Sequence, residues 1–165
     1  MNKFFTRNTP PGIDPRQEIG TFLLAQVLSI LFSFQFFVSY QDARARLYHT
    51  VDGKRCLLEG AKIADFGEIL GISLYGFGLT AVAMLGFIVY HYAYYRQGSM
   101  SIYLMKRLPN PTERHRRAWT LPILTMAASM AVALAVLLIY FAIYLLATPK
   151  ACLPDEIWRQ LWRII

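Results

Sequence analysis

Apolar residues gather in three long blocks that contain no charged side chain: Ile19–Tyr40, Ile69–Tyr95 and Ala118–Pro149. A helix needs about 20 residues to cross a hydrocarbon core of about 30 Å, so each block is long enough to span a membrane. A helix also satisfies its own backbone hydrogen bonds in lipid. The pattern predicts an all-α integral membrane protein with transmembrane helices over residues 19–40, 69–95 and 118–148.

The segments that flank these blocks are polar. Residues 1–18 carry charges and prolines, which predicts a cytoplasmic tail ahead of an uncleaved first anchor rather than a signal peptide. Asp52-Gly53 in the connection 41–68 favours a β-hairpin, with a plain loop as the alternative. In the tail, residues 149–165, one helical face is apolar and predicts an amphipathic helix through Ile157, Trp158, Leu161, Trp162 and Ile165.

The charge of the chain is distributed in a way that predicts its orientation. The net charge is +7, and residues 96–117 carry six basic side chains against the single acid Glu113. Basic residues concentrate on the cytoplasmic side of short membrane loops. We therefore expect residues 96–117 and the N-terminus inside, and residues 41–68 and the C-terminus outside, in a multi-pass protein of a bacterial plasma membrane. Because the positive charge follows topology, we expect lipid as a partner and no nucleic acid.

Small residues mark the faces on which membrane helices pack closely. In the second predicted span these are Gly76, Gly78 and Gly86, and in the third they are Ala127, Ala131 and Ala135. The three alanines recur at every fourth position and so share one helix face. That face is expected to pack either within the chain or against another membrane subunit.

Sequence patterns that support catalysis are absent. There is no phosphate-binding GxxxxGK[ST] loop, no HExxH, no CxxC and no GxSxG, so we expect no enzyme and no cofactor. The histidines are dispersed, and His91 is expected at the membrane interface. No Asp, Glu, Lys or Arg falls inside a predicted span, which argues against an ion-coupled pump. Cys56 and Cys152 lie on the same predicted side and form either a disulfide or two free thiols.

The basic connection 96–117 has the pattern of two short helices separated by Pro109. The first helix has an apolar face flanked by the basic residues Lys106 and Arg107. Its residues are Ile102, Tyr103, Leu104, Met105, Lys106, Arg107 and Leu108. The second begins with Asn110 and Pro111, a preferred helix start. This pair of short helices, residues 96–117, is expected either to lie on anionic lipid or to insert into a groove of a cytoplasmic partner.

The stretch SIYLMKRLPNPTERHRRAWTLPIL resembles the inner loop of permeases of type-2 ATP-binding-cassette exporters and of small bacterial membrane proteins that accompany them. The resemblance covers roughly Tyr95 to Leu124. It implies that Ile102 to Leu108 act as a coupling helix for a separate ATPase, although such permeases usually have six spans. It favours a non-catalytic membrane subunit of an ATP-binding-cassette transporter, packed on other membrane subunits. The alternative is a small structural or regulatory subunit of another membrane complex.

Overall fold

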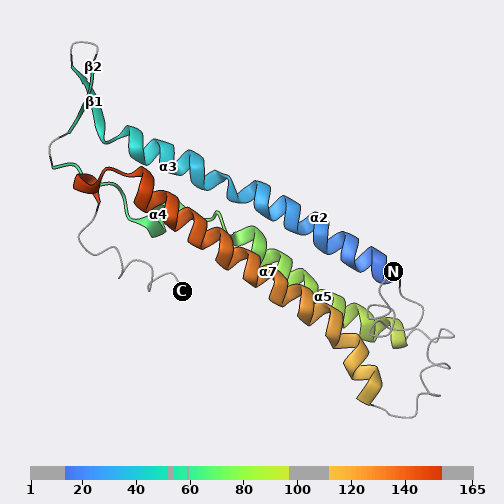
Figure 1. Ribbon diagram of the computed structural model, residues 1–165. Coiled ribbons are helices and arrows are strands. Elements are labelled where there is room, and N and C mark those ends of the chain that lie inside the picture. Colours follow the sequence, from blue (N-terminus) through green and yellow to red (C-terminus); the bar gives the residue numbers. More distant parts are fainter. Residues whose placement is uncertain (1–13, 52–53, 59, 97–111, 154–165) are drawn as a thin grey trace. The chain divides into compact units, whose positions relative to one another are not determined.

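The computed structural model describes residues 14–51, 54–58, 60–96 and 112–153 and is mostly helical (Figure 1). Its elements are α2 (Pro15–Ser33), α3 (Gln35–Ala45), β1 (Tyr48–Val51), β2 (Lys54–Leu57), α4 (Phe66–Leu70), α5 (Tyr75–Arg96), α7 (Thr112–Ala147) and the short 3-10 helix η1 (Lys150–Cys152). Within these ranges, three helical segments are long and apolar enough to cross a membrane: Arg16–Ala45, Tyr75–Ala93 and His115–Ala147. The prediction of a mostly helical protein with three helices suited to crossing a membrane is confirmed.

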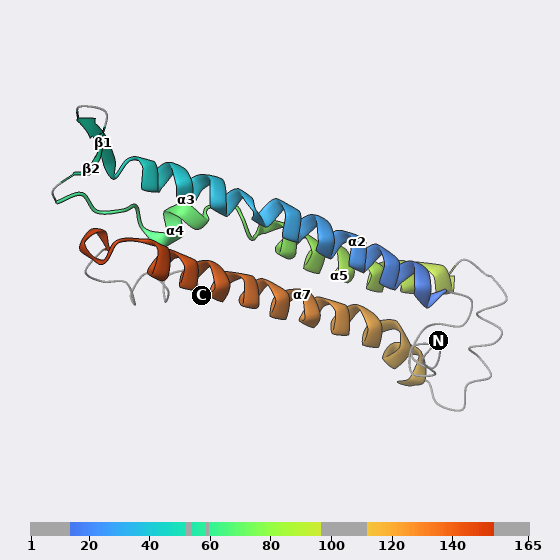
Figure 2. The same cartoon turned by 45° about the horizontal axis from the view of Figure 1, so that its top comes forward.

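The chain forms two compact units. The first joins Met1–Ser29 with Gly76–Val132, and the second joins Ile30–Tyr75 with Ala133–Ile165. The described part of the first unit is built from α2 up to Ser29, α5 from Gly76 and α7 up to Val132, which run alongside one another in both views (Figures 1 and 2).

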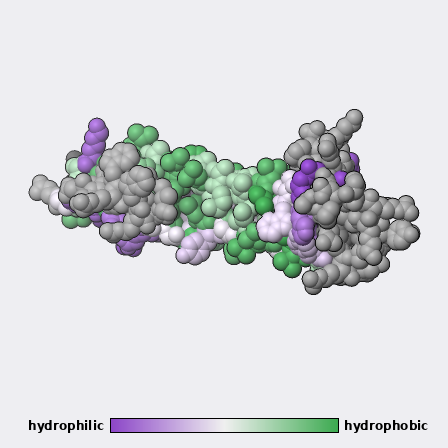
Figure 3. All heavy atoms as spheres, turned by 90° about the horizontal axis from the view of Figure 1, so that it is seen from below, coloured by the Kyte–Doolittle hydropathy of each residue, from purple (hydrophilic) through white to green (hydrophobic). Residues whose placement is uncertain are grey.

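The first unit has apolar side chains on its outside and both apolar and polar side chains inside, with Phe77, Met84 and Leu121 among the buried apolar ones. Its buried polar side chains come from all three helices: Glu18, Gln26, Ser29, Thr80, His91, Thr125 and Ser129. By contrast, Leu24, Leu79 and Val89 are 62%, 71% and 69% exposed. Hydrophobic residues cover the helical surface seen in Figure 3. Lipid provides no hydrophobic drive for helix association, so close packing and polar contacts between helices hold such a unit together.

Gly76 allows α2 and α5 to approach closely. A Cβ atom at this glycine would lie 3.0 Å from the Cα of Ser29. At the same crossing, the hydroxyls of Ser29 and Thr80 are 3.0 Å apart and share a hydrogen bond. Gly78 and Gly86 differ, because a Cβ atom there would meet nothing within 4 Å.

Gly76→Val is expected to destabilise the first unit by about 1–3 kcal/mol, because its branched side chain overpacks against the Ser29 backbone. Gly78→Val places the same residue two positions away on the same helix, in open space, and isolates the steric effect. The free energy of unfolding of both variants is measured by SDS titration in mixed micelles, followed by circular dichroism. Equal losses in the two variants would mean that the close approach at Gly76 contributes nothing.

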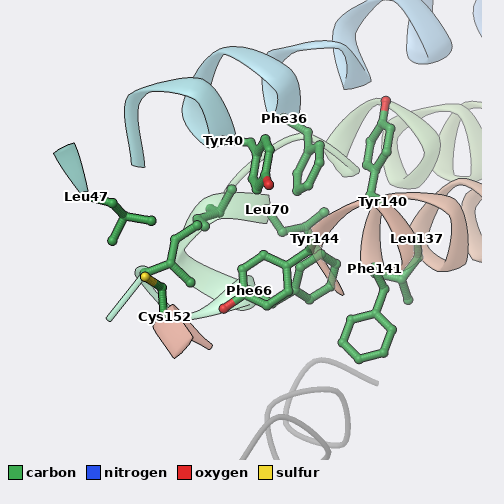
Figure 4. Close-up of a cluster of buried hydrophobic side chains, with 12 residues drawn as sticks. Phe36, Tyr40, Leu47, Phe66, Leu70, Leu137, Tyr140, Phe141, Tyr144 and Cys152 are labelled. Atoms are coloured by element: carbon green, nitrogen blue, oxygen red, sulfur yellow. The ribbon is translucent and has the colours of Figure 1, made fainter. Parts of the chain in front are cut away.

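The second unit is held by an aromatic core (Figure 4). Phe36 of α3 stacks on Tyr140 of α7 with ring centroids 4.4 Å apart, and its other neighbours include Tyr40 and Phe66. Phe66 of α4 also packs against the ring of Tyr144, at 5.5 Å. Aromatic pairs of this kind add stabilisation beyond the area that they bury.

Tyrosine hydroxyls in this core also find polar partners. Tyr144 donates a hydrogen bond to the carbonyl oxygen of Ala64 at 3.1 Å, and the hydroxyls of Tyr40 and Thr148 are 3.0 Å apart. The Ser33 hydroxyl donates to the Ile30 carbonyl and therefore accepts from Tyr140, whose hydroxyl lies 2.8 Å away. A serine bonded to its own preceding turn tends to bend a helix, and α2 gives way to α3 immediately after Ser33.

The connection between the first two spans contains an antiparallel strand pair at the position where Asp52-Gly53 favours a hairpin. Strands β1 and β2 pair Tyr48 with Leu57 and Val51 with Lys54. After the short helix α4, Gly71 adopts a φ of +46°, which favours glycine and ends that helix. The second span was predicted to begin at residue 69. Its helix, α5, begins at Tyr75.

Cys152 is a free, buried thiol in the core of the second unit, so of the two alternatives for Cys56 and Cys152 this structure has the unbridged one. A backbone hydrogen bond joins the connection 41–68 to the segment after α7, because the amide of Ile63 donates to the Cys152 carbonyl at 2.9 Å. The predicted amphipathic tail helix lies outside the described residues, since the description ends at residue 153.

Candidate functional site: a buried glutamate and histidine

Glu18, at the end of the predicted polar tail, is a buried helical residue of the first unit. Helix α2 begins at Pro15, so Glu18 is helical, and the candidate membrane span begins at Arg16. Its side chain shares a face of α2 with Gln26 and Ser29, and the residue is 2% exposed.

His91 of α5 contacts this glutamate. It is 0% exposed, so its side chain is enclosed by protein. Its Nε2 atom is 3.2 Å from Oε2 of Glu18, which is ion-pair distance. The alignment of the two groups does not meet the geometry of a hydrogen bond, and neither carboxylate oxygen of Glu18 has a hydrogen-bond partner among the described residues.

A proline on α7 supplies the partner for the other ring nitrogen. Pro122 lies inside α7 and has no N–H, so it cannot donate to the carbonyl of Ala118, four residues earlier. That carbonyl instead lies 3.0 Å from Nδ1 of His91. Because a carbonyl oxygen only accepts, Nδ1 carries the hydrogen. His91 thus joins α2, through Glu18, to α7, through Ala118.

Further into the same unit, the polar contacts are of two kinds. The Ser29–Thr80 bond joins α2 to α5, and the Ser129 hydroxyl of α7 donates to the carbonyl of Phe77 at 3.3 Å. Gln26 is only 7% exposed, yet neither its oxygen nor its nitrogen has a hydrogen-bond partner in the described part of the chain. Gln26 therefore makes no hydrogen bond to a neighbouring helix within the described residues.

A second group of bonds joins the end of α5 to the start of α7. The Tyr92 hydroxyl lies 2.6 Å from Nδ1 of His115 and accepts a hydrogen bond from Nε1 of Trp119 at 2.9 Å. These contacts and the His91–Ala118 bond hold together the two helix ends that flank residues 97–111. The predicted docking residues Ile102 to Leu108 lie in that interval, outside the described residues.

The small residues expected to pack against other helices divide into two groups. Gly76 packs within the chain, against Ser29. The other five are exposed: Gly78, Gly86, Ala127, Ala131 and Ala135. The three exposed alanines, hereafter the alanine face of α7, make no internal packing surface. Next to Ala127 is a shallow groove of about 420 Å³ lined by Arg116, Trp119, Thr120, Ile123 and Leu124.

Within the described ranges, no group of three or more His, Cys, Asp or Glu side chains is placed to hold a metal ion. No family model, curated protein or solved structure matches the chain.

The Glu18–His91 pair changes one inference from the sequence. An ion-coupled role was argued against because no charged residue fell inside a predicted span, whereas Glu18 lies within the candidate span Arg16–Ala45 and His91 within Tyr75–Ala93. Ionisable side chains inside membrane spans are rare and usually functional. The signal was present in the sequence: Glu18, Gln26, Ser29 and Ser33 fall on one side of a helix.

Proposed function

We propose that the chain is a non-catalytic membrane subunit of an ATP-binding-cassette transporter. Its basic connection, residues 96–117, would face the cytoplasm and dock a separate ATPase through Ile102 to Leu108. Another membrane subunit would pack on the alanine face. The asymmetry of charge between the connections supports this orientation. The proposed location is a bacterial plasma membrane.

The observation that carries the assembly part of the proposal is the exposure of the alanine face. Small side chains let helix backbones approach closely, and their interaction surface is lost if they face only lipid. All three alanines point away from the chain's own packing, and the groove beside Ala127 is apolar apart from Arg116 and Thr120 at its edge. This surface suits a second transmembrane helix.

The contacts at the helix ends support a mechanical role for the basic connection. Tyr92, His115 and Trp119 hold the end of α5 against the start of α7, next to the bond between His91 and Ala118. A force applied by an ATPase to residues 97–111 would therefore be transmitted to both helices together. Through His91 it would also reach Glu18 on α2.

The test is purification of the tagged chain in mild detergent from its native membrane, with identification of co-purifying proteins by mass spectrometry. We expect a P-loop ATPase and at least one further membrane protein at near-stoichiometric yield. Leu104→Asp combined with Met105→Asp is expected to release the ATPase and leave the membrane partner bound. Recovery without any ATPase would contradict the transporter assignment.

Ala131→Leu is expected to reduce recovery of the membrane partner roughly tenfold, equivalent to about 1.4 kcal/mol of binding free energy, by blocking close helix approach. Ala147→Leu is the matched control. Ala147 is also an exposed alanine of α7, but about 160° of helix rotation separates it from the centre of the alanine face. Equal recovery with both variants would mean that the alanine face contacts only lipid.

The alternative is a structural or regulatory subunit of another membrane complex. It is favoured by the polar interior of the first unit, which stabilises a helix bundle without ATP-driven motion. In that case, partners without an ATPase co-purify, and Leu104→Asp with Met105→Asp weakens lipid binding only.

A further inference from the structure

We propose that Glu18 and His91 form a buried proton-binding site, in which one proton held between Oε2 and Nε2 keeps α2 in contact with α5. The inference is independent of the proposed transporter role, because it concerns the chain alone. It rests on the geometry of the pair and on the commitment of the other ring nitrogen to Ala118.

The tautomer of His91 is fixed by its bond to the Ala118 carbonyl, which requires a hydrogen on Nδ1. A neutral imidazole has only one N–H, so Nε2 of neutral His91 carries a lone pair. That lone pair lies next to the Glu18 carboxylate, whose Oε2 is 3.2 Å from Nε2.

Without an added proton, Nε2 of His91 and Oε2 of Glu18 both carry lone pairs and lie 3.2 Å apart. Two lone pairs at this separation repel, and the site offers no water-like screening because both side chains are at most 1% exposed. One proton removes the repulsion in either of two ways. It converts the pair to imidazolium and carboxylate, or to imidazole and carboxylic acid. Both states contain the same single proton, so the proton belongs to the pair.

The charged and titratable side chains near the pair are all more exposed than the pair itself. The described titratable or charged side chains close in sequence on the three helices are Asp14, Arg16, Tyr90, Tyr92, His115, Arg116 and Arg117, and none of them is buried. Neither oxygen of Glu18 has a hydrogen-bond donor in the described residues. A deprotonated pair would therefore hold an unsatisfied buried carboxylate, and the contact between α2 and α5 would open.

The pair predicts how stability depends on pH. An unfolded chain with ordinary pKa values of about 4.3 for Glu and about 6.5 for His binds one proton between these values and none above them. The folded pair retains its proton, so the folding equilibrium constant is expected to fall about tenfold per pH unit above about pH 6.5. Between about pH 4.3 and 6.5 the pair contributes no slope.

Glu18→Gln is expected to reverse this dependence. The amide N–H of glutamine can donate to Nε2 of neutral His91, so the contact needs no added proton. The unfolded variant still protonates His91 below about pH 6.5, so its folding constant falls as the pH decreases and is level above that value. Other titrating groups cancel in the ratio of the two folding constants, which should fall about tenfold per pH unit from about pH 5 to 8.

The experiment is SDS unfolding of the purified full chain in mixed micelles at several pH values, for wild type, Glu18→Gln and the control His115→Gln. His115 is exposed, so this variant is expected to keep the wild-type slope. A ratio of wild-type to Glu18→Gln folding constants that does not change with pH would overturn the proposal.

A measurement on the wild type keeps the proposal testable if Glu18→Gln does not fold. Nitrogen NMR of histidine-labelled protein should show Nδ1 of His91 protonated throughout, and Nε2 either protonated or accepting a hydrogen bond from the Glu18 carboxyl group above about pH 6.5. An Nε2 atom that at that pH is neither protonated nor hydrogen-bonded to a protonated Glu18 carboxyl group would overturn the inference. Stoichiometric zinc in the purified protein, absent from Glu18→Gln, would also overturn it, because a metal ion would then occupy the proton's place.

Discussion

His91→Ala is expected to lower the free energy of unfolding by about 3–5 kcal/mol, because it removes one partner of a buried ionisable pair. Glu18 would remain enclosed without a counter-group, since it is 2% exposed and has no other hydrogen-bond partner in the described residues. The carbonyl of Ala118 would lose its donor as well, because Pro122 cannot replace His91. The measurement is SDS unfolding in mixed micelles at neutral pH.

Two comparisons separate pairing from simple loss of volume. Glu18→Leu combined with His91→Leu replaces the pair by apolar side chains of similar size, and such replacements are often close to neutral. We expect this double variant to be more stable than His91→Ala. His115→Ala removes an exposed histidine from the same end of the unit and should cost no more than about 1.5 kcal/mol, the value of its bond to Tyr92. If the double variant is the least stable of the three, the Glu18–His91 pair stabilises the fold on balance.

Phe36→Ala is expected to destabilise the second unit by about 3–5 kcal/mol, because it opens a cavity in the aromatic core. Phe36 is 0% exposed and contacts Tyr40, Phe66 and Tyr140 through its ring. These contacts join α3 to α4 and α7 (Figure 4). Thermal unfolding followed by near-ultraviolet circular dichroism reports the loss of the fixed aromatic environment.

Phe32→Ala is the matched control for this prediction. Phe32 lies one helical turn earlier and is 43% exposed, so its removal leaves no enclosed cavity. We expect a change within about 0.5 kcal/mol, as for surface positions in general. Similar losses in the two variants would contradict the view that the enclosed core, and not total aromatic content, holds the second unit.

Together, these expectations divide the chain by chemistry. The first unit depends on polar contacts between helices and on one close backbone approach at Gly76, whereas the second depends on stacked aromatic rings with bonded hydroxyls. A polar interior costs stability unless its groups are paired. The unpaired oxygens of Glu18 and the unpaired amide of Gln26 are therefore the places where a ligand, a proton or a partner would have the largest effect.

The sequence by itself determined that the chain forms long apolar helices suited to a membrane. Three runs without a charged residue leave the backbone no alternative in lipid but to bond to itself, and this local requirement can be read from any one run. The position favoured for the hairpin also follows from local chemistry, since Gly53 tolerates the backbone of a tight turn. The boundaries were less well determined: Glu18 was placed outside its helix, and the turn at Gly71 was missed.

Only the tertiary structure decided which residues meet. Glu18, His91 and Ala118 come from three helices, and a rotation of any helix by one residue, about 100°, would separate them. The same rotation decides that Gly76 faces inward while the alanine face points outward, although both patterns look alike as sequence. Helix formation depends on neighbours along the chain, whereas the pairing of Glu18 with His91 depends on how three helices are packed.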